Sequence, residues 1–367
     1  MNHPKVIAFY LPQYHPIPEN DNWWGKGFTE WTNVTKGKPL YKGHQQPFLP
    51  SDLGYYDLRV PEVRIEQARL AQNAGISAFC YWHYWFGNGK RLLERPFNEV
   101  LRSGRPDFPF CLAWANESWT GKWHGLDKKI IIEQTYPGLK DYKNHFYSLI
   151  PAFADKRYFK INGMNIFVVY ATVNLPEPKI FMDTWRNLAY KEGLPDFFFV
   201  GVKNNRQNTE KDYDGWIKNQ PTLRGVVSHP NRVEKAFFKT TSIDLMKLLR
   251  YGTLRGPKIY PYKKYVEETF NLALEDKEYP NVLPNWDNTP RSKQNGLVLD
   301  GSTPELFGQL LRKAIKLVEN RENKLIFIKA WNEWAEGNTL EPSVIYQDKY
   351  LKMAREVLLD THQNGNH

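Results

Sequence analysis

Two carboxylates stand three residues apart in the segment Lys329–Gly337 (KAWNEWAEG), directly after the apolar run 325–328. Side chains at odd spacing point to opposite faces of a strand, so Glu333 and Glu336 converge only if the backbone turns between them. Gly337 makes such a turn easier because it adopts backbone conformations closed to other residues. Desolvation by the neighbouring tryptophans and mutual repulsion would drive the two pKa values apart, which suits an acid/base pair. The alternative interpretation is that the tryptophans are core residues and the acids are solvated loop charges.

Eight apolar runs alternate with segments of helical periodicity along the chain. Such apolar strands, separated by amphipathic helices, indicate parallel pairing with both faces covered. Eight units predict an α/β fold, a single closed (β/α)8 TIM barrel with long aromatic-rich βα loops. A doubly wound open sheet is the alternative, but Gly87-Asn88-Gly89 lacks the third glycine of a phosphate loop. The expected strands are Val6–Leu11, Ala78–Trp82, Phe110–Ala115, Asn165–Tyr170, Phe197–Val202, Gly225–Ser228, Val282–Trp286 and Leu325–Trp331.

The chain reads as one domain over residues 1–367. Its 367 residues are 41% hydrophobic and 15% aromatic, which is ample for a large core, and no linker tract interrupts them. Cys80 and Cys111 lie in apolar runs, so buried free thiols are expected, and no metal-ligand pattern includes them. We expect no cofactor.

The net charge of +10 arises from 50 basic and 40 acidic residues that are mostly interspersed. No nucleic-acid motif accompanies it, so no nucleic-acid partner is expected. A basic run from Lys247 to Lys264 is interpreted as a solvated face with tyrosines packing inward, and contact with an anionic partner is its alternative. The start of the chain has no signal-peptide pattern, and no apolar run reaches the roughly 20 residues of a membrane span. A cytoplasmic location is therefore expected.

Aromatic and hydrogen-bonding residues gather just past the expected strand ends, where barrel enzymes carry their active sites. Indole and phenol faces stack on sugar rings, while carboxylates, amides and guanidinium groups bind hydroxyls, so the set indicates a carbohydrate cleft. For any single tryptophan, the alternative is a core position. The candidate substrate-binding residues are Tyr10, Gln13, Tyr14, Glu30, Trp31, Trp82, His83, Trp85, Trp114, Asn116, Glu117, Trp119, Asp287, Arg291, Trp331, Asn332, Trp334 and Glu341.

Five segments in order resemble the WbsX-type family: FYLPQYH at 9–15, GFTEWTNV at 27–34, FCYWHYWF at 79–86, LAWANESW at 112–119 and WNEWAEG at 331–337. Members often accompany bacterial polysaccharide or O-antigen genes, and they are similar to glycoside hydrolase family 99. That resemblance implies a (β/α)8 barrel, no metal, and retaining hydrolysis of α-mannosidic linkages through a 1,2-anhydro sugar. It implies that Glu333 is the base acting on the sugar 2-hydroxyl and that Glu336 is the acid protonating the leaving oxygen.

Two other functions stay open. A glycosyltransferase could use Asp212-Tyr213-Asp214 to hold a metal on a nucleotide diphosphate, with the basic run meeting the phosphates. A barrel that binds glycans without catalysis would leave the paired acids idle. Binding of a nucleotide diphosphate with Mn²⁺ is predicted by the transferase hypothesis alone.

Overall fold

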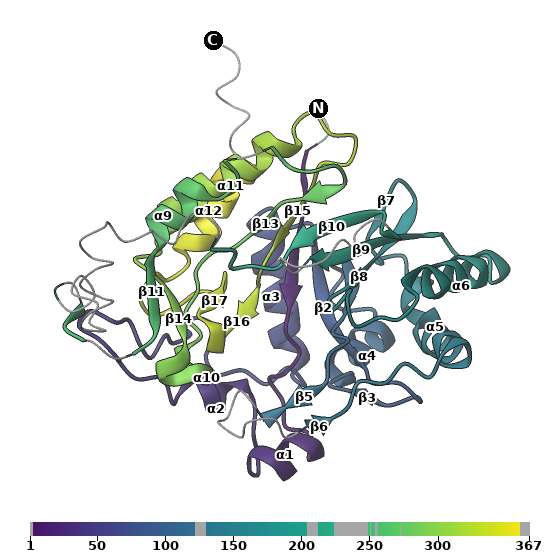
Figure 1. Ribbon diagram of the computed structural model, residues 1–367, viewed down its shortest axis with the longest axis horizontal. Helices are drawn as coiled ribbons and strands as arrows, with labels where there is room; N and C mark the ends of the chain where they lie inside the picture. Colours follow the sequence, from purple (N-terminus) through teal and green to yellow (C-terminus); the bar gives the residue numbers. More distant parts are fainter. Residues whose placement is uncertain are drawn as a thin grey trace, which may run out of the picture.

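A nearly closed barrel of parallel strands forms the centre of the molecule. The computed structural model describes residues 3–121, 130–203, 212–223, 249, 251–253, 256–271 and 273–359. Its main sheet runs in the order β12-β10-β9-β8-β4-β2-β1-β15-β13, and Figure 1 shows it surrounded by helices. The strands are β1 (Lys5–Tyr10), β2 (Ala78–Trp85), β4 (Phe110–Trp114), β8 (Met164–Val169), β9 (Phe197–Lys203), β10 (Gly215–Lys218), β12 (Glu278–Tyr279), β13 (Asn281–Val282) and β15 (Leu325–Ile328).

The two ends of this path meet at one point of the chain. β12 pairs with β10, β13 pairs with β15, and only Pro280 separates β12 from β13. Proline lacks the N–H of a continuous ladder, so one strand position is divided into two short pieces. The sheet therefore curves back toward its start, and the expected (β/α)8 barrel is confirmed.

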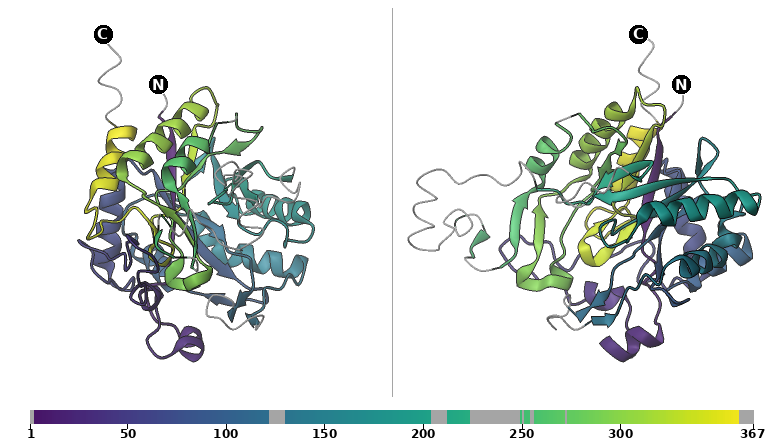
Figure 2. Two further views of the ribbon diagram at one scale, coloured as in Figure 1. Left: turned by 60° about the vertical axis from the view of Figure 1, so that its left-hand side comes forward. Right: turned by 45° about the vertical axis from the view of Figure 1, so that its right-hand side comes forward.

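Helices cover the outside of the barrel. In Figures 1 and 2, α9, α11 and α12 lie on one side, while α5 and α6 pack together on the other. α11 buries one face, where Leu310, Leu311 and Ala314 face the core. The longer helices are α3 (Pro61–Asn73), α4 (Arg95–Ser103), α5 (Leu139–Phe153), α6 (Pro178–Lys191), α9 (Tyr262–Glu268), α11 (Pro304–Val318) and α12 (Lys349–Leu358).

Short helices and strands lie at the carboxyl ends of the barrel strands and form the candidate site. Apart from β7 (Lys160–Ile161), which pairs with β8, they lie in the loops that follow barrel strands. These loop elements are α1 (Pro18–Trp24), α2 (Glu30–Val34), β3 (Arg91–Leu92), β5 (Trp119–Thr120), β6 (Ile130–Ile132), β11 (Lys258–Pro261), α10 (Thr289–Ser292), η3 (Lys293–Asn295), β14 (Leu297–Asp300), β16 (Asn332–Glu333), η4 (Trp334–Glu336) and β17 (Asn338–Thr339).

The expected strand positions agree with the structure at most places and differ around the sixth and seventh. The expected strand Gly225–Ser228 lies outside the described residues. β10 was not expected, because its sequence GWIK offers only two apolar residues between a glycine and a lysine. The expected strand Val282–Trp286 is wrong in its extent, since pairing stops at Val282 and the chain then turns toward α10.

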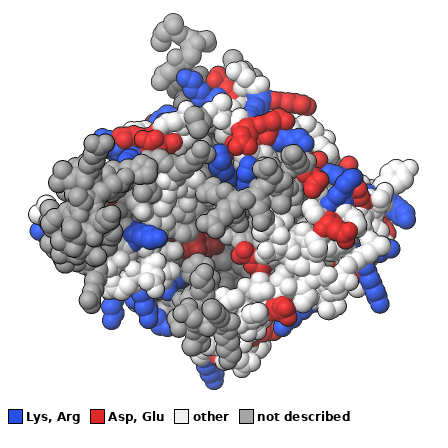
Figure 3. Space-filling view, in the orientation of Figure 1, with Lys and Arg blue, Asp and Glu red and all other residues white. Residues whose placement is uncertain are grey.

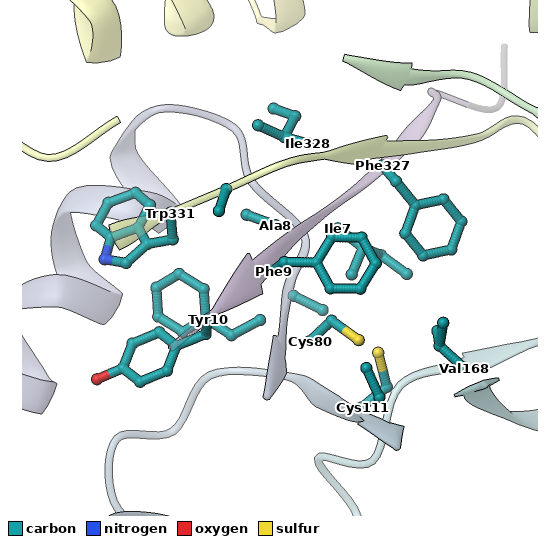
Figure 4. Packing of buried hydrophobic residues seen from close by; sticks show 14 of the residues in the cluster. Ile7, Ala8, Phe9, Tyr10, Cys80, Cys111, Val168, Phe327, Ile328 and Trp331 are labelled. Carbon is teal, nitrogen blue, oxygen red and sulfur yellow. The ribbon is translucent and has the colours of Figure 1, made fainter. Parts of the chain in front are cut away.

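Side chains from opposite sides of the barrel fill its interior. Figure 4 shows Phe9 and Phe327 packed beside Cys80 and Cys111, whose Cα positions pair across β2 and β4. Both thiols are free and buried, as expected. Phe9 also stacks on Trp82, with ring centroids 4.8 Å apart. The packed interior thus supports an aromatic ring that faces the site described below.

The basic run is only partly described. Within it, Tyr251 and Tyr262 are buried while Lys258 and Lys263 are exposed, in agreement with tyrosines that pack inward. Across the portions of the chain that are described, no helix combines the length and apolar character needed to cross a membrane.

Candidate active site

A tight hairpin past the last barrel strand brings the two paired acids together. Asn332 and Glu333 in β16 pair antiparallel with Thr339 and Asn338 in β17, and the 3₁₀ turn η4 joins the two strands. Side chains three residues apart eclipse in a 3₁₀ turn, so Glu336 returns to the side of Glu333. Gly337 closes the turn at φ 52°. The turn expected from the spacing is confirmed.

A single guanidinium group holds three carboxylates. Arg291, from α10, donates through Nη2 to Glu333 Oε2 at 3.0 Å and through Nη1 to Glu336 Oε1 at 2.7 Å. Its Nε donates to Glu30 Oε1 at 2.7 Å. Glu30 is the first residue of α2, and its Oε1 also accepts from Asn33 Nδ2 at 3.1 Å. Segments near residues 30, 291 and 333 therefore converge on one charge cluster.

The charges in this cluster are desolvated and unequal in number. Burial is the largest cause that raises the pKa of Glu333, to about 7, and the charge of Glu336 adds to it, while Arg291 opposes the rise. Burial lowers the pKa of Lys329, which lies nearby. Three acids thus face two cations, so the excess negative charge favours one proton shared within the cluster near neutral pH.

The cluster forms the floor of a cavity of about 250 Å³ at the carboxyl ends of the strands. Figure 3 shows acidic side chains near the middle of the face that Figure 1 presents. Glu117 stands in the cavity wall, where desolvation raises its pKa. The aromatic side chains that line the cavity are Trp24, Phe28, Trp82, Tyr84, Trp119 and Tyr170. Aromatic walls around a few polar groups are the usual make-up of a small-ligand site.

Buried hydrogen bonds fix the hairpin from below. The Asn332 amide accepts from Leu11 N at 2.7 Å and donates to Leu11 O at 3.0 Å, which ties β16 to the end of β1. The Tyr14 hydroxyl donates to the Asn332 carbonyl and accepts from Trp334 N. These bonds leave the Glu333 backbone little freedom, since both neighbouring residues are anchored.

Glu341 holds the two tryptophans that flank Glu333. Its Oε1 accepts from Trp331 Nε1 at 2.8 Å and from Gln67 Nε2 at 2.6 Å. Its Oε2 accepts from Trp334 Nε1 at 2.6 Å and from the Tyr56 hydroxyl at 2.8 Å. Burial raises the pKa of Glu341 to about 7, although all four hydrogen bonds oppose the rise. With every lone pair used, Glu341 positions the hairpin and does not line the cavity.

Asp287 connects the hairpin to the helix that carries Arg291. Its Oδ1 accepts from Thr289 N at 3.0 Å and from Thr289 Oγ1 at 2.6 Å, which fixes the start of α10. Its Oδ2 accepts from Gln46 Nε2 at 2.6 Å and lies 2.8 Å from His44 Nε2. Its backbone N donates to Glu336 O at 2.7 Å. Asp287 thus sets Glu336 and Arg291 relative to each other, outside the lining of the cavity.

The structure divides the expected site residues into two groups. His83 illustrates the second: its Nε2 lies 2.8 Å from His145 Nε2 in a fully buried pair whose pKa values burial lowers. Lining the cavity are Gln13, Glu30, Trp82, Glu117, Trp119, Arg291, Glu333 and Glu336. Outside this lining are the partly exposed Asp287 and the buried Tyr10, Tyr14, Trp31, His83, Trp85, Trp114, Asn116, Trp331, Asn332, Trp334 and Glu341.

Several lining residues were not on the expected list. Lys329 and Tyr170 directly follow β15 and β8, so the rule of reading strand ends would have found them. Asn20 and Asn33 come from α1 and α2, inside a long loop whose path no local pattern predicts. Throughout the described ranges, no group of three or more His, Cys, Asp or Glu side chains has the arrangement of a metal site.

Comparisons with known protein sequences give matches over nearly the whole chain. The model of the family described as Glycosyltransferase WbsX matches residues 6–354. Two proteins described as uncharacterized protein WxcX, from two strains of Xanthomonas campestris pv. campestris, are each 36% identical to the chain. Each alignment covers 96% of the chain and 49% of the relative, so the chain spans about half the length of these curated relatives.

The fold is similar to those of two solved structures. One is described as a glycoside hydrolase-like protein, with a TM-score of 0.58 and 14% identity over 98% of this chain and 94% of that one. The other is the GH99 endo-alpha-mannosidase from Bacteroides thetaiotaomicron, with a TM-score of 0.53 and 16% identity over 96% of each chain. At these identities the likeness is one of fold.

Proposed function

Because the chain belongs to the WbsX glycosyltransferase family, we propose that it is a carbohydrate-active enzyme and that its chemistry is the retaining hydrolysis of a glycosidic bond. The observation that carries the proposal is the cluster of Glu30, Glu333 and Glu336 around Arg291 in an aromatic cavity. Carboxylates supply proton transfer, and the rings supply stacking faces for sugars. The proposed substrate is a bacterial-type glycan or an α-mannoside-like linkage.

Glu333 and Glu336 have complementary roles in the proposed reaction. Glu333 takes the proton of the sugar 2-hydroxyl, and that oxygen attacks C1 while the bond from C1 to the leaving oxygen breaks. Glu336 gives its proton to the leaving oxygen. Water then attacks C1 of the 1,2-anhydro sugar and loses its proton to Glu336, while the 2-oxygen regains its proton from Glu333. One water is consumed, and both carboxyl groups return to their first states.

The electrostatics of the cluster support Glu333 as the base. A general base works best when its pKa lies near the working pH, and burial places the pKa of Glu333 at about 7. Arg291 contacts both acids, so it holds them at one place on the cavity floor. Trp82 and Trp119 line the cavity and supply aromatic surface for the sugar units of the substrate.

Glycosyl transfer is the second candidate, and the description of the WbsX family as glycosyltransferases favours it. The same pair of acids could pass the sugar to an acceptor hydroxyl in place of water. A nucleotide sugar suits the cavity poorly, because its lining carries the four acids Glu30, Glu117, Glu333 and Glu336 against two cations.

The Asp-x-Asp segment lies away from the cavity. Asp214 accepts from Arg186 Nη2 at 2.7 Å and from Phe199 N at 2.8 Å, and it precedes β10, at the opposite end of that strand from the cavity. The carboxylate of Asp214 is therefore bound to groups in the barrel wall.

A barrel that binds glycans without catalysis remains a further alternative, and the variants below distinguish it.

The proposal is tested by screening the purified protein for sugar release from a panel of bacterial and fungal glycans that includes α-mannans. Released reducing sugar that is absent with Glu333→Gln supports the proposal. Glu62→Gln is the matched control, because Glu62 is exposed on α3. Release that persists unchanged in the Glu333 variant contradicts the assignment. Efficient turnover of a 2-deoxy substrate contradicts the anhydro-sugar route alone.

A further inference from the structure

A second cavity of about 240 Å³ lies beside the candidate active site. Asp287 and Gly337 line this second cavity, while Glu336 and Arg291 line the first. Gly337 follows Glu336 in the chain, and Asp287 N donates to Glu336 O. The two cavities are therefore separated by a wall only one turn of chain thick.

Aromatic rings and uncharged polar groups line much of the second cavity. Tyr41 and Tyr346 contribute rings, and Gln45 and Ser302 contribute an amide and a hydroxyl. The described lining includes the carboxylates of Asp287 and Asp300 and neither lysine nor arginine. Such a lining disfavours phosphate or carboxylate ligands by repulsion and suits the hydroxyls and C–H faces of a neutral sugar.

The indole N–H of Trp286, unpaired among the described residues, is an independent observation that indicates a ligand. Its side chain lines the second cavity and is only 7% exposed, yet its indole Nε1 is buried with no acceptor among the residues that the structure describes. A buried donor without an acceptor costs roughly 1–3 kcal/mol. A small rotation of the ring toward the cavity would let a ligand oxygen accept from Nε1 and remove that cost. Trp286 also lies near the first cavity, because Nζ of Lys329, which lines that cavity, is 5.0 Å from the centroid of the Trp286 ring.

We infer that the second cavity is a separate binding site for a neutral sugar unit of the same glycan that enters the first cavity. The inference rests on the proposed function, since it takes a glycan as the substrate. A cavity of this size holds one sugar unit, and its wall is shared with the catalytic hairpin. A polymer that occupies both sites is held beside the cleavage point, so its local concentration there rises without any new contact in the first cavity.

The test observes the indole N–H signals of the 13 tryptophans by ¹⁵N NMR during titration with α-mannotriose. Trp286→Phe identifies the Trp286 signal, and Trp82→Phe and Trp119→Phe identify two signals from the first cavity. We expect the Trp286 signal to move in a saturable way in the wild-type protein. In Ser302→Phe, which fills the second cavity, the Trp286 signal should stay in place while the signals of Trp82 and Trp119 still move.

The outcomes separate the two proposals. Movement of the Trp82 and Trp119 signals without movement at Trp286 overturns the second site and leaves the proposed function standing. Movement at Trp286 that persists in Ser302→Phe also overturns it, because the effect then comes through the shared wall. No movement at any of the three signals contradicts both proposals for α-mannosides. Ser302→Ala, which fills nothing, should behave like the wild-type protein and controls for damage to the fold.

Discussion

Replacing Arg291 tests the electrostatic design of the site. Arg291→Gln removes the positive charge that contacts Glu30, Glu333 and Glu336, and a shorter neutral side chain remains. Since Arg291 opposes the rise in the pKa of Glu333, that pKa should climb above its value of about 7. If Glu333 is the base, activity needs its ionised form. The acidic limb of the pH profile should then move to higher pH.

The size of the change follows from the contact distances. Opposite charges about 4 Å apart interact by about 4 kcal/mol at an effective dielectric constant of about 20. Dividing this energy by 1.36 kcal/mol for each pH unit gives about 3 pH units as an upper bound for the shift in the pKa of Glu333. Because Arg291 is shared among three acids, we expect the midpoint to move by about 1 to 3 pH units. Activity at neutral pH should fall by about 5-fold to 500-fold, in proportion to the lost ionised fraction.

The assay is kcat/KM for an aryl glycoside across pH, because that ratio reports the free enzyme. Arg69→Gln is the control, since the Arg69 side chain is 56% exposed and pairs with Glu66 on the surface of α3. Circular dichroism verifies that the Arg291 variant is folded. An acidic limb that stays in place, or moves to lower pH, would refute the reasoning that Arg291 keeps Glu333 ionised.

Three further perturbations test the framework of the site. Gly337→Ala should lower the melting temperature and should lower kcat/KM at least 100-fold, because a Cβ there would lie 2.9 Å from Asp287 Cβ at a φ of 52°. Gly54→Ala is the control: at φ 58° with nothing within 4 Å of the added Cβ, it should lower only stability. Equal activity losses in the two variants would contradict the argument from close approach. Asp287→Asn should place an amide N–H against a donor and cost about 1–3 kcal/mol in denaturant unfolding, with a matching loss of kcat, and an unchanged kcat would show that Asp287 does not position Arg291. Glu333→Gln should flatten the dependence of stability on pH. The folded pKa of about 7 exceeds the unfolded value of 4.5, so about 3 kcal/mol of stabilisation present at low pH is lost as pH rises between those values. Melting curves recorded across that window should show the loss in the wild-type protein and not in the variant, and parallel curves would contradict the elevated pKa.

Local chemistry in the sequence was sufficient to predict the barrel and the turn that brings Glu333 and Glu336 together. Apolar runs separated by amphipathic helices specify parallel strands whatever their loops do, and the spacing of Glu333 and Glu336 requires a turn. The convergence of Arg291 on both acids could not be read from the sequence. It depends on where α10 and α2 dock. Asp287, which accepts from Thr289 at the start of α10, also accepts from Gln46, 241 residues away in the chain.

The aromatic residues were harder to assign than the acids. A tryptophan at a strand end can face the cavity, as Trp82 does, or lie behind it, as Trp114 does with its indole N–H bonded to Trp85 O. The residue type is the same in both cases, and the direction in which the side chain points depends on the register of its strand in the barrel. Glu341 was expected in the cleft for its charge. Four donors that come from three separate segments instead enclose it.

The measurement that tests the central claim most directly is the dependence of kcat/KM on the leaving group in Glu333→Gln and Glu336→Gln, with Glu62→Gln as control. Loss of the proposed acid should depress activity steeply on a natural glycan and much less on an aryl glycoside whose leaving group needs little protonation. Loss of the proposed base should depress both, because activation of the 2-hydroxyl precedes departure of any leaving group. Rates equal to the wild-type protein in both variants would contradict the assignment of these carboxylates to catalysis.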